Sequence, residues 1–542
     1  MDKIRIRNLR SLKDTNDIDI KPLTILVGKN SSGKSTFLRF FPLMKQTLSI
    51  KKNEPILWYS KENVDFGSFY ESLNRNSVTE HIGFDFNFTV SELNDGTIEA
   101  KPMEIFLSVD LKEKNLGKIT ITMFDTIIKF IEVGDEYFVY INNQKFNDPF
   151  IILNSEVFDK FLPSFILKVN DNQEKRKISL VEYFREILYG ELSKIVKNQK
   201  LKINNSELDL ELKKIVSKIH LVNLELINEG IEKTIRQLNK AINREFTKNS
   251  YYFGDSFLEE YDLKSDSLNK VIVNVLQEAS EVEIERLNNL LYGVYLGNIL
   301  NMCNEYLTTY FSKVHYIAPL RASAQRYYRI QGLAVDEIDP QGENIPMAIT
   351  HLNWQDKNNF KKWMKQNFGF EIDTNTVGGH VSLNISFGTN EKLNLADTGF
   401  GFSQILPILL LVWRVENEKT NKKSLRRSIN INTHTIVIEQ PELHLHPALQ
   451  ARLTDALVKC IDVTNKRGIN LTVVLETHSE TIVNRVGQLI YQEKIGNEKV
   501  NVLIFGDLEN GTNPSESSIN TVSYNEEGAI ENWPLGFFYP EV

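Results

Sequence analysis

The sequence contains little cysteine, with only Cys303 and Cys460 among 542 residues. Two cysteines cannot form a disulfide framework or a four-cysteine zinc site. Long apolar runs are also missing, because the most apolar stretch, Phe402–Trp413, is short and contains Gln404 and Pro407. The first residues, MDKIRIRNLR, lack the apolar core of a signal peptide. We therefore expect a cytoplasmic protein that is not inserted in a membrane.

An excess of basic charge is lacking as well. The formal net charge is −8 and the isoelectric point is about 5.8, which argues against a constitutively basic nucleic-acid-binding surface. Two basic stretches, Lys194–Lys202 and Lys422–Arg427, are candidate local patches, and the alternative is that both are solvated helix faces or loops. The length and the hydrophobic content of 41% allow about three domains with substantial cores.

The first half of the sequence changes its periodicity twice. From about His81 to Lys145, apolar residues alternate with polar ones, and Phe84, Phe86 and Phe88 share one face, so we predict an antiparallel β layer. The text from about Ser179 to Phe311 is helical and rich in charge. It sustains no heptad repeat over many turns, which favours a compact helical insertion over a coiled-coil arm.

Both ends of the sequence have an α/β pattern. The run Leu23–Val27 is continuously apolar, as in a strand buried on both faces, and Ser35–Thr47 follows it with the pattern of a helix. Near the C-terminus, Ile436–Ile438 and Leu471–Leu475 are two more buried strands, and Ile405–Trp413 is an apolar helix. We therefore predict an α/β fold.

The sequence GKNSSGKS at Gly28–Ser35 matches the phosphate-binding loop G-x-x-x-x-G-K-[ST] in full. Its glycines allow backbone N–H groups to surround phosphates at the start of a helix. Lys34 would reach the β- and γ-phosphates, and the hydroxyl group of Ser35 would bind Mg²⁺. The motif lies between a predicted strand and a predicted helix, as it requires, and it predicts ATP and Mg²⁺ as cofactors.

A second motif, TIVIEQPELHLHP, starts at Thr435. Its apolar strand would deliver Glu439 to the metal site as the Walker B acid. The next residue is Gln440, which can orient a water molecule but cannot accept its proton. Glu442 is therefore an alternative general base.

Two further loops are candidate contacts of the γ-phosphate. His478 follows the apolar strand of LTVVLETHS, where it could report the presence of this phosphate. Gly401 and Ser403 lie in DTGFGFSQ, at the start of an apolar helix, which is a second N-terminus able to bind phosphate. Because two such loops of one chain cannot wrap one nucleotide, we expect a head-to-tail dimer in which this loop closes over the ATP of the partner.

The order P-loop, large insertion, GFSQ, E-x-P-E-x-H-L-H-P and T-H-S resembles the ABC/SMC-like ATPases of the RecF and OLD type. The resemblance implies a head that is split across the chain, a homodimer with ATP between two heads, or a larger oligomer of such dimers. It also implies that Arg10 and Ser11 lie beside the nucleotide. OLD-type proteins carry a Toprim nuclease after the Walker B strand, and we do not expect one here.

The stretches Tyr316–Tyr328 and Gly528–Phe538 resemble a bacterial subgroup, the ATPase subunit of Septu-type and retron-associated antiphage defence systems. This resemblance implies a separate HNH-type nuclease subunit as partner and, in retron systems, a reverse transcriptase with its noncoding RNA and DNA. Nucleic acid would be contacted through the partner. No nuclease motif is recognisable in the sequence itself.

These observations predict a P-loop NTPase of the ABC/SMC-head type with an antiparallel β layer and a large helical insertion. The predicted segments are an N-terminal ATPase lobe at 1–150, the helical insertion at 151–312 and a C-terminal ATPase lobe at 313–542. We expect a slow, dimeric ATPase that regulates an effector nuclease. The alternatives are an ATPase that binds DNA ends for repair and a scaffold that holds ATP without turnover.

The predicted site residues form three groups. The nucleotide-binding residues are Arg10, Ser11, Gly28, Lys29, Asn30, Ser31, Ser32, Gly33, Lys34, Ser35, Thr36, Gly401 and Ser403. The catalytic residues are Glu439, Gln440, Glu442 and His478, and the Mg²⁺ ligands are Ser35 and Glu439.

Overall fold

The computed structural model describes residues 1–90, 102–152, 157–171, 174–198, 205–219, 230–231, 233–235, 272–332, 335–388, 391–418, 432–506 and 519–533. The chain forms two compact units, one of residues 1–89, 109–116 and 306–542 and the other of residues 90–108 and 117–305. The basic stretch Lys422–Arg427, residues 199–202 of the other basic stretch, and residues 534–538 lie outside the described residues. The division into segments 1–150, 151–312 and 313–542 remains a prediction.

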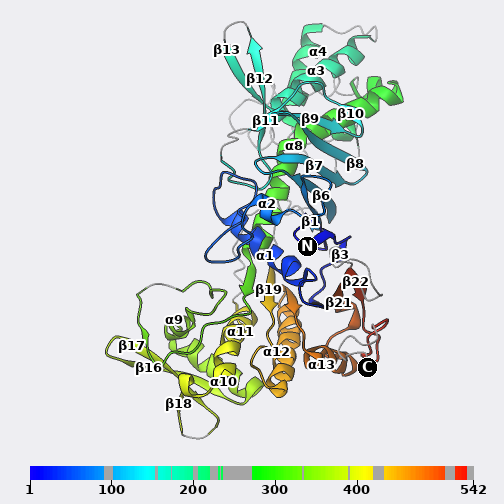
Figure 1. Cartoon of the computed structure of the whole chain (residues 1–542). Coiled ribbons are helices and arrows are strands. Elements are labelled where there is room, and N and C mark those ends of the chain that lie inside the picture. Colours follow the sequence, from blue (N-terminus) through cyan, green and yellow to red (C-terminus); the bar gives the residue numbers. More distant parts are fainter. Residues whose placement is uncertain are drawn as a thin grey trace, which may run out of the picture. The chain divides into compact units, whose positions relative to one another are not determined.

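A six-stranded sheet with the strand order β14-β19-β20-β4-β21-β22 forms the centre of the first unit. Figure 1 labels its strands β19, β21 and β22. Its strands are β4 (Leu23–Gly28), β14 (Val314–Ile317), β19 (Thr433–Glu439), β20 (Asn470–Glu476), β21 (Val500–Phe505) and β22 (Ile519–Val522). The strands β14, β19, β20, β4 and β21 pair in parallel, and β22 is antiparallel to β21. Every residue of β4, β19 and β21 is buried, which explains the apolar runs Ile25–Val27, Ile436–Ile438 and Val502–Phe505 within them. The strands predicted in this part of the chain are thus confirmed, and the carboxyl ends of β4, β20 and β19 meet at one edge.

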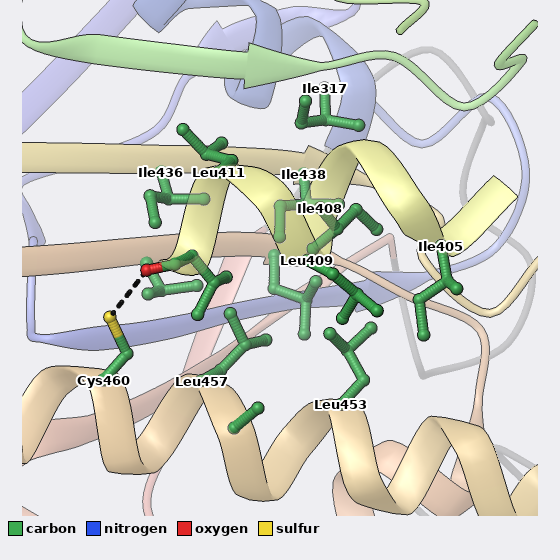
Figure 2. Close-up of a cluster of buried hydrophobic side chains, with 14 of the residues drawn as sticks. Ile317, Ile405, Ile408, Leu409, Leu411, Ile436, Ile438, Leu453, Leu457 and Cys460 are labelled. Carbon is green, nitrogen blue, oxygen red and sulfur yellow. Dashed lines mark hydrogen bonds between the residues drawn. The ribbon is translucent and has the colours of Figure 1, made fainter. Parts of the chain in front are cut away.

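Four long helices accompany this sheet. They are α1 (Lys34–Ser49), α11 (Phe400–Glu416), α12 (Pro447–Lys466) and α13 (Glu480–Tyr491). Helix α11 is buried along most of its length, and Figure 2 shows Ile405 and Leu409 of α11 facing Leu453 of α12. Burying one such side chain contributes about 1.5–3 kcal/mol, so this core holds the edge of the sheet firmly. The predicted helices at residues 35–47 and 405–413 lie within α1 and α11.

Smaller elements complete the first unit. Strand β1 (Lys3–Leu9) pairs antiparallel with β2 (Leu12–Asp14), β3 (Ile18–Asp19) and β5 (Ile82–Val90). The short helix α2 (Phe69–Ser72) begins with a capping box. Between β14 and α11 lie β15 (Tyr328–Arg329), α9 (Ile345–Thr350), α10 (Trp354–Phe368), β16 (Glu371–Val377), β17 (His380–Ser386), β18 (Leu393–Asn394) and η3 (Leu395–Asp397), and η4 (Asn497–Lys499) precedes β21.

The second unit contains antiparallel strands and helices. Its elements are β8 (Thr126–Val133), β9 (Glu136–Ile141), β10 (Gln144–Lys145), β11 (Ile151–Ile152), β12 (Phe165–Asp171), β13 (Glu174–Ser179), α3 (Leu180–Asn198) and α4 (Asn205–Lys218). The elements β5, β6 (Met103–Leu111), β7 (Leu116–Met123) and α8 (Glu281–Ser312) contain residues of both units. In β9 the buried side chains are Tyr137, Val139 and Ile141. The period of two is therefore as predicted for this strand.

The predicted fold class is confirmed. The chain is an α/β protein in which a phosphate-loop motif joins a buried parallel strand to a helix, and antiparallel strands form an additional layer. In the part of the chain that the structure describes, every helix is too short or too polar to cross a bilayer.

Candidate nucleotide-binding site

The phosphate-loop motif forms the turn between β4 and α1. Gly28 has a φ of 148°, and a Cβ atom there would lie 2.3 Å from the carbonyl oxygen of Phe505. Ser31 and Gly33 also have positive φ values, of 64° and 101°. Such left-handed residues turn successive N–H groups toward one concave face. Helix α1 starts directly after this loop and no side chain caps it, so its first N–H groups are available to a phosphate.

Lys34 points back into the curve of this loop. Its Nζ donates hydrogen bonds to the carbonyl oxygens of Gly28 at 2.9 Å and Lys29 at 2.7 Å, and the residue is only 4% exposed. Burial lowers the pKa of Lys34, and the charge of Glu476 opposes this effect. An ammonium group held at the centre of a glycine loop is the arrangement that phosphate recognition requires.

The other predicted loop residues surround this lysine. Ser32 Oγ donates to the carbonyl oxygen of Lys29 at 2.8 Å, which closes the turn. The side chains of the loop differ in exposure: Lys29, Asn30 and Ser31 are exposed, Ser32, Ser35 and Thr36 are half-buried, and Gly33 is buried.

Ser35, the predicted metal ligand of the loop, contacts a carboxylate that the sequence analysis did not single out. Its Oγ donates to Glu476 Oε1 at 3.0 Å. Glu476 is the last residue of β20, is 2% exposed, and its Oε2 has no hydrogen-bond partner among the described residues. Burial raises the pKa of Glu476 to about 7, with a further increase from the charge of Glu439, while the hydrogen bond from Ser35 opposes the rise.

Glu439, the predicted Walker B acid, is engaged elsewhere. It accepts hydrogen bonds from Arg39 Nε at 2.7 Å, from Arg39 Nη2 at 3.0 Å and from the hydroxyl group of Tyr316 at 2.8 Å. Arg39 lies one helical turn after Ser35 on α1. Glu439 is 1% exposed, so this pairing neutralises a charge that would otherwise be costly to bury. Its role as a Mg²⁺ ligand remains a prediction.

Sequence reasoning thus missed Glu476, although the signal was present. The strand LTVVLE ends in an acid in the same way as TIVIE does. The two acids lie directly opposite each other in the parallel register of β19 and β20. Because β20 lies between β19 and β4, its terminal carboxylate is the one that the structure brings to Ser35.

A network of backbone and side-chain hydrogen bonds holds the loop after β19. Gln440 has a φ of 44°, and its N–H donates to the carbonyl oxygen of Glu476 at 2.9 Å. Arg321 Nη2 donates to the carbonyl oxygen of Glu439 at 2.7 Å. The amide of Gln404 on α11 exchanges hydrogen bonds with the backbone of Arg321 at 3.0 and 3.3 Å. This chain connects the start of α11 to the residue that the sequence predicts to position water.

Glu442 is used to hold the His478 turn. Its Oε1 accepts from the N–H of His478 at 2.7 Å, and its Oε2 accepts from Thr477 Oγ1 at 2.9 Å. His478 is exposed to solvent on one side. The partial burial of its ring, together with the nearby charge of Lys34, lowers its pKa. A neutral imidazole near Lys34 is suited to a hydrogen bond with a phosphate oxygen. The proposed role of Glu442 as a base competes with this structural use of both its oxygens.

The first turn of α11 packs on the loop that follows β19. A Cβ atom at Gly401 would lie 2.7 Å from the carbonyl oxygen of His444, so only glycine fits there. Ser403 is 7% exposed, and its Oγ donates to the carbonyl oxygen of Phe400 at 2.8 Å. Phe400 is 62% exposed. Over the described residues, no hydrogen bond joins this turn to the phosphate loop of the same chain.

Arg10, which the resemblance places beside the nucleotide, has a φ of 50°. Its guanidinium group lies 4.4 Å from the ring centroid of Phe66 and donates to the carbonyl oxygen of Asp65 at 3.2 Å. Burial and the charge of Arg39 lower its pKa, which locates Arg10 near α1. Ser11 follows it at a half-buried position.

Comparisons with known proteins identify the family of the chain. A family model described as AAA ATPase domain matches residues 1–483. No match to the chain was found among curated proteins. Similar solved structures include the Smc head domain with an extended coiled coil bound to the C-terminal domain of ScpA from Pyrococcus furiosus (9% identity, 96% of each chain, TM-score 0.32) and the SMC head domain from Thermotoga maritima (10% identity, 96% of this chain and 97% of that chain, TM-score 0.31). Because the sequence identities and TM-scores are this low, the functions of those head domains are not assigned to this chain. The family model, in contrast, spans most of the sequence, and the chain therefore belongs to the AAA ATPase domain family.

Proposed function

We propose that this protein is a Mg²⁺- and ATP-dependent dimeric switch that holds and restrains a separate nuclease in bacterial antiphage defence. The observation that carries the nucleotide part is Lys34, which is buried inside a left-handed loop at the start of α1. An ammonium group inside such a loop is complementary in charge to the phosphates of a nucleotide.

The described residues fit both cofactors. Lys34 has a third N–H donor beyond the two that contact the loop, and α1 presents its uncapped N-terminus. Ser35 and a neighbouring carboxylate offer the hard oxygen atoms that Mg²⁺ prefers. When bound, Mg²⁺ would offset the negative charge of the phosphates during their transfer. Gln440 would orient the attacking water, and His478, held by Glu442, would contact the γ-phosphate.

The resemblance to antiphage ATPase subunits supports the nuclease partner. Two residues of the segment that carries this resemblance, Tyr316 and Arg321, contact Glu439 at the carboxyl end of β19. That segment is therefore in a position to respond to the state of the site. We propose an HNH-type nuclease as the regulated partner, with nucleic acid contacted through it, and in a retron system a reverse transcriptase with its noncoding RNA.

Turnover of ATP should be slow, and Gln440→Glu should increase it. A glutamine orients water but accepts no proton, so the wild-type rate is expected to lie below about 10 s⁻¹, the median for enzymes. The substitution adds a proton acceptor without changing the length of the side chain, and general-base catalysis contributes about 100-fold or more when it is well placed. The release of phosphate under saturating ATP measures both rates.

Gln488→Glu is the matched control, because it makes the same change at an exposed position of α13. A fast wild-type enzyme, or an unchanged rate in Gln440→Glu, would show that another residue supplies the base. A wild-type protein that binds ATP without any turnover would instead favour a scaffold.

Binding of ATP should join two heads through the first turn of α11. Ser403 is buried, so an arginine at that position would disturb α11, whereas Phe400 is exposed and a change there leaves the core intact. We expect the wild-type protein to increase its mass to that of a dimer when Mg²⁺ and ATP are added. Phe400→Glu should remain monomeric while it still binds ATP. Light scattering after size-exclusion chromatography measures the mass.

Tyr491→Glu, at an exposed position that ends α13, is the control and should dimerise as the wild type does. Dimerisation of Phe400→Glu, or an ATP-bound dimer in which residues 399–404 lie far from the partner's phosphate loop, would refute this assembly. A switch within one chain would then be the better account.

A further inference from the structure

Two buried carboxylates end neighbouring strands at the candidate site, and they have different partners. Glu439 and Glu476 face each other in the β19–β20 register and are 1% and 2% exposed. The negative charge of each carboxylate needs a compensating partner, because an isolated buried carboxylate is strongly unfavourable. The answer differs between them.

The charge of Glu439 is compensated within the protein. The guanidinium group of Arg39 binds both of its oxygens, and the hydroxyl group of Tyr316 adds a third hydrogen bond. A bidentate arginine both neutralises the carboxylate and fixes its plane. This pair ties α1 to β19, and it leaves Glu439 with little capacity for a cation.

Glu476 is compensated only in part. Its Oε1 accepts the Ser35 hydroxyl hydrogen at 3.0 Å, whereas its Oε2 is buried and has no partner among the described residues. Leaving a buried acceptor unsatisfied is unfavourable, and more so when it is charged. The same carboxylate accepts a hydrogen bond from Ser35, the predicted metal ligand of the phosphate loop. We therefore expect the missing partner of Oε2 beside Ser35.

We propose that Glu476, and not Glu439, is the carboxylate of the Mg²⁺ site. Its Oε1 holds the hydrogen of the Ser35 hydroxyl group, which leaves the lone pairs of Ser35 Oγ for the metal. Its unpaired Oε2 would supply an acceptor for a hydrated Mg²⁺ ion. Mg²⁺ gives up its water reluctantly and is commonly held through one or two carboxylates together with the phosphates of the substrate. Glu476 is thus a positioning residue for the metal, and Glu439 is a structural one.

This inference rests on the proposed binding of Mg²⁺ and ATP, and it is tested by metal dependence rather than by turnover. The affinity for a fluorescent ATP analogue is measured over a series of free Mg²⁺ concentrations and in EDTA. Glu476→Gln should raise the Mg²⁺ concentration that restores tight binding by about 10–100-fold, which is typical for the loss of an outer partner of a metal. Binding in EDTA should stay as in the wild type.

Glu439→Gln is the matched substitution on the neighbouring strand and should leave the Mg²⁺ requirement unchanged. Glu476→Asp retains the charge but withdraws it by one methylene group, and its Mg²⁺ requirement should lie between those of the wild type and Glu476→Gln. Thermal melting identifies any variant that does not fold, and the aspartate variant still decides the question if the glutamine variant fails to fold.

The outcomes separate this inference from the proposed function. A wild-type chain that binds no ATP analogue in Mg²⁺ refutes the proposed function itself. A wild-type chain that binds it while Glu476→Gln keeps the wild-type Mg²⁺ requirement overturns only the assignment of Glu476. If the Mg²⁺ requirement of Glu439→Gln rises as much as that of Glu476→Gln, or more, then Glu439 is the carboxylate of the Mg²⁺ site, as the sequence predicts.

Discussion

Replacing Lys34 by alanine is expected to weaken ATP binding by at least about 100-fold while the chain stays folded. A charge-assisted hydrogen bond contributes about 1.5–3 kcal/mol, and the third N–H donor of Lys34 would make one to a phosphate oxygen. Since 1.4 kcal/mol corresponds to a factor of ten, one such bond at the upper end of this range accounts for the expected loss. Isothermal titration with Mg²⁺ and ATP measures the affinity.

We expect Lys34→Ala to reduce the stability of the fold much less than it reduces the affinity for ATP. The substitution removes the donors to two backbone carbonyl groups of the loop, which lies at the edge of the sheet and has exposed neighbours. Lys51→Ala, at an exposed position just after α1, is the control and should bind ATP as the wild type does. Unchanged affinity in folded Lys34→Ala would exclude the phosphate-loop assignment.

Replacing Arg39 by methionine is expected to destabilise the first unit by about 3 kcal/mol. Breaking a buried ion pair from one side costs about 3–5 kcal/mol because the remaining charge is left in the interior. Glu439 would keep only the hydroxyl group of Tyr316, and the lower end of the range applies because Arg39 is partly exposed. Thermal unfolding with and without ATP measures the effect, since the transition that ATP shifts belongs to the unit that binds it.

The pair of Arg485 and Asp455 provides a control of the same geometry. It is also bidentate, at 2.7 and 3.0 Å, but both side chains are partly exposed. Arg485→Met should therefore cost no more than about 1 kcal/mol. The double variant Arg39→Met with Glu439→Gln should recover much of the lost stability, because it removes the buried charge. A loss in Arg39→Met no larger than in Arg485→Met would show that solvent compensates Glu439.

Local motifs were the part of the site that could be predicted. The glycine loop at Gly28–Ser35 requires a strand before it and a helix after it, and both are consecutive in the sequence. The strands β19 and β20 are recognisable by their short apolar runs, Ile436–Ile438 and Val473–Leu475, because residues buried on both faces of a sheet are mostly apolar. In the β layer, the sequence gives the period of two, but the choice of the buried face in β9 depends on its partners, which select Tyr137 and Val139.

The partners within the site were decided by tertiary structure. Ser35 and Glu476 are 441 positions apart, and Arg39 and Glu439 are 400 positions apart. The strands β19 and β20 both end in glutamate, and the sequence of neither strand indicates which of them pairs with β4. That choice follows from the order of the strands in the sheet, because the strand beside β4 delivers its last side chain to Ser35. The sequence by itself determined that the chain carries a phosphate loop and two acids, and only the packing of the sheet decided which acid faces the loop and which one is neutralised by arginine.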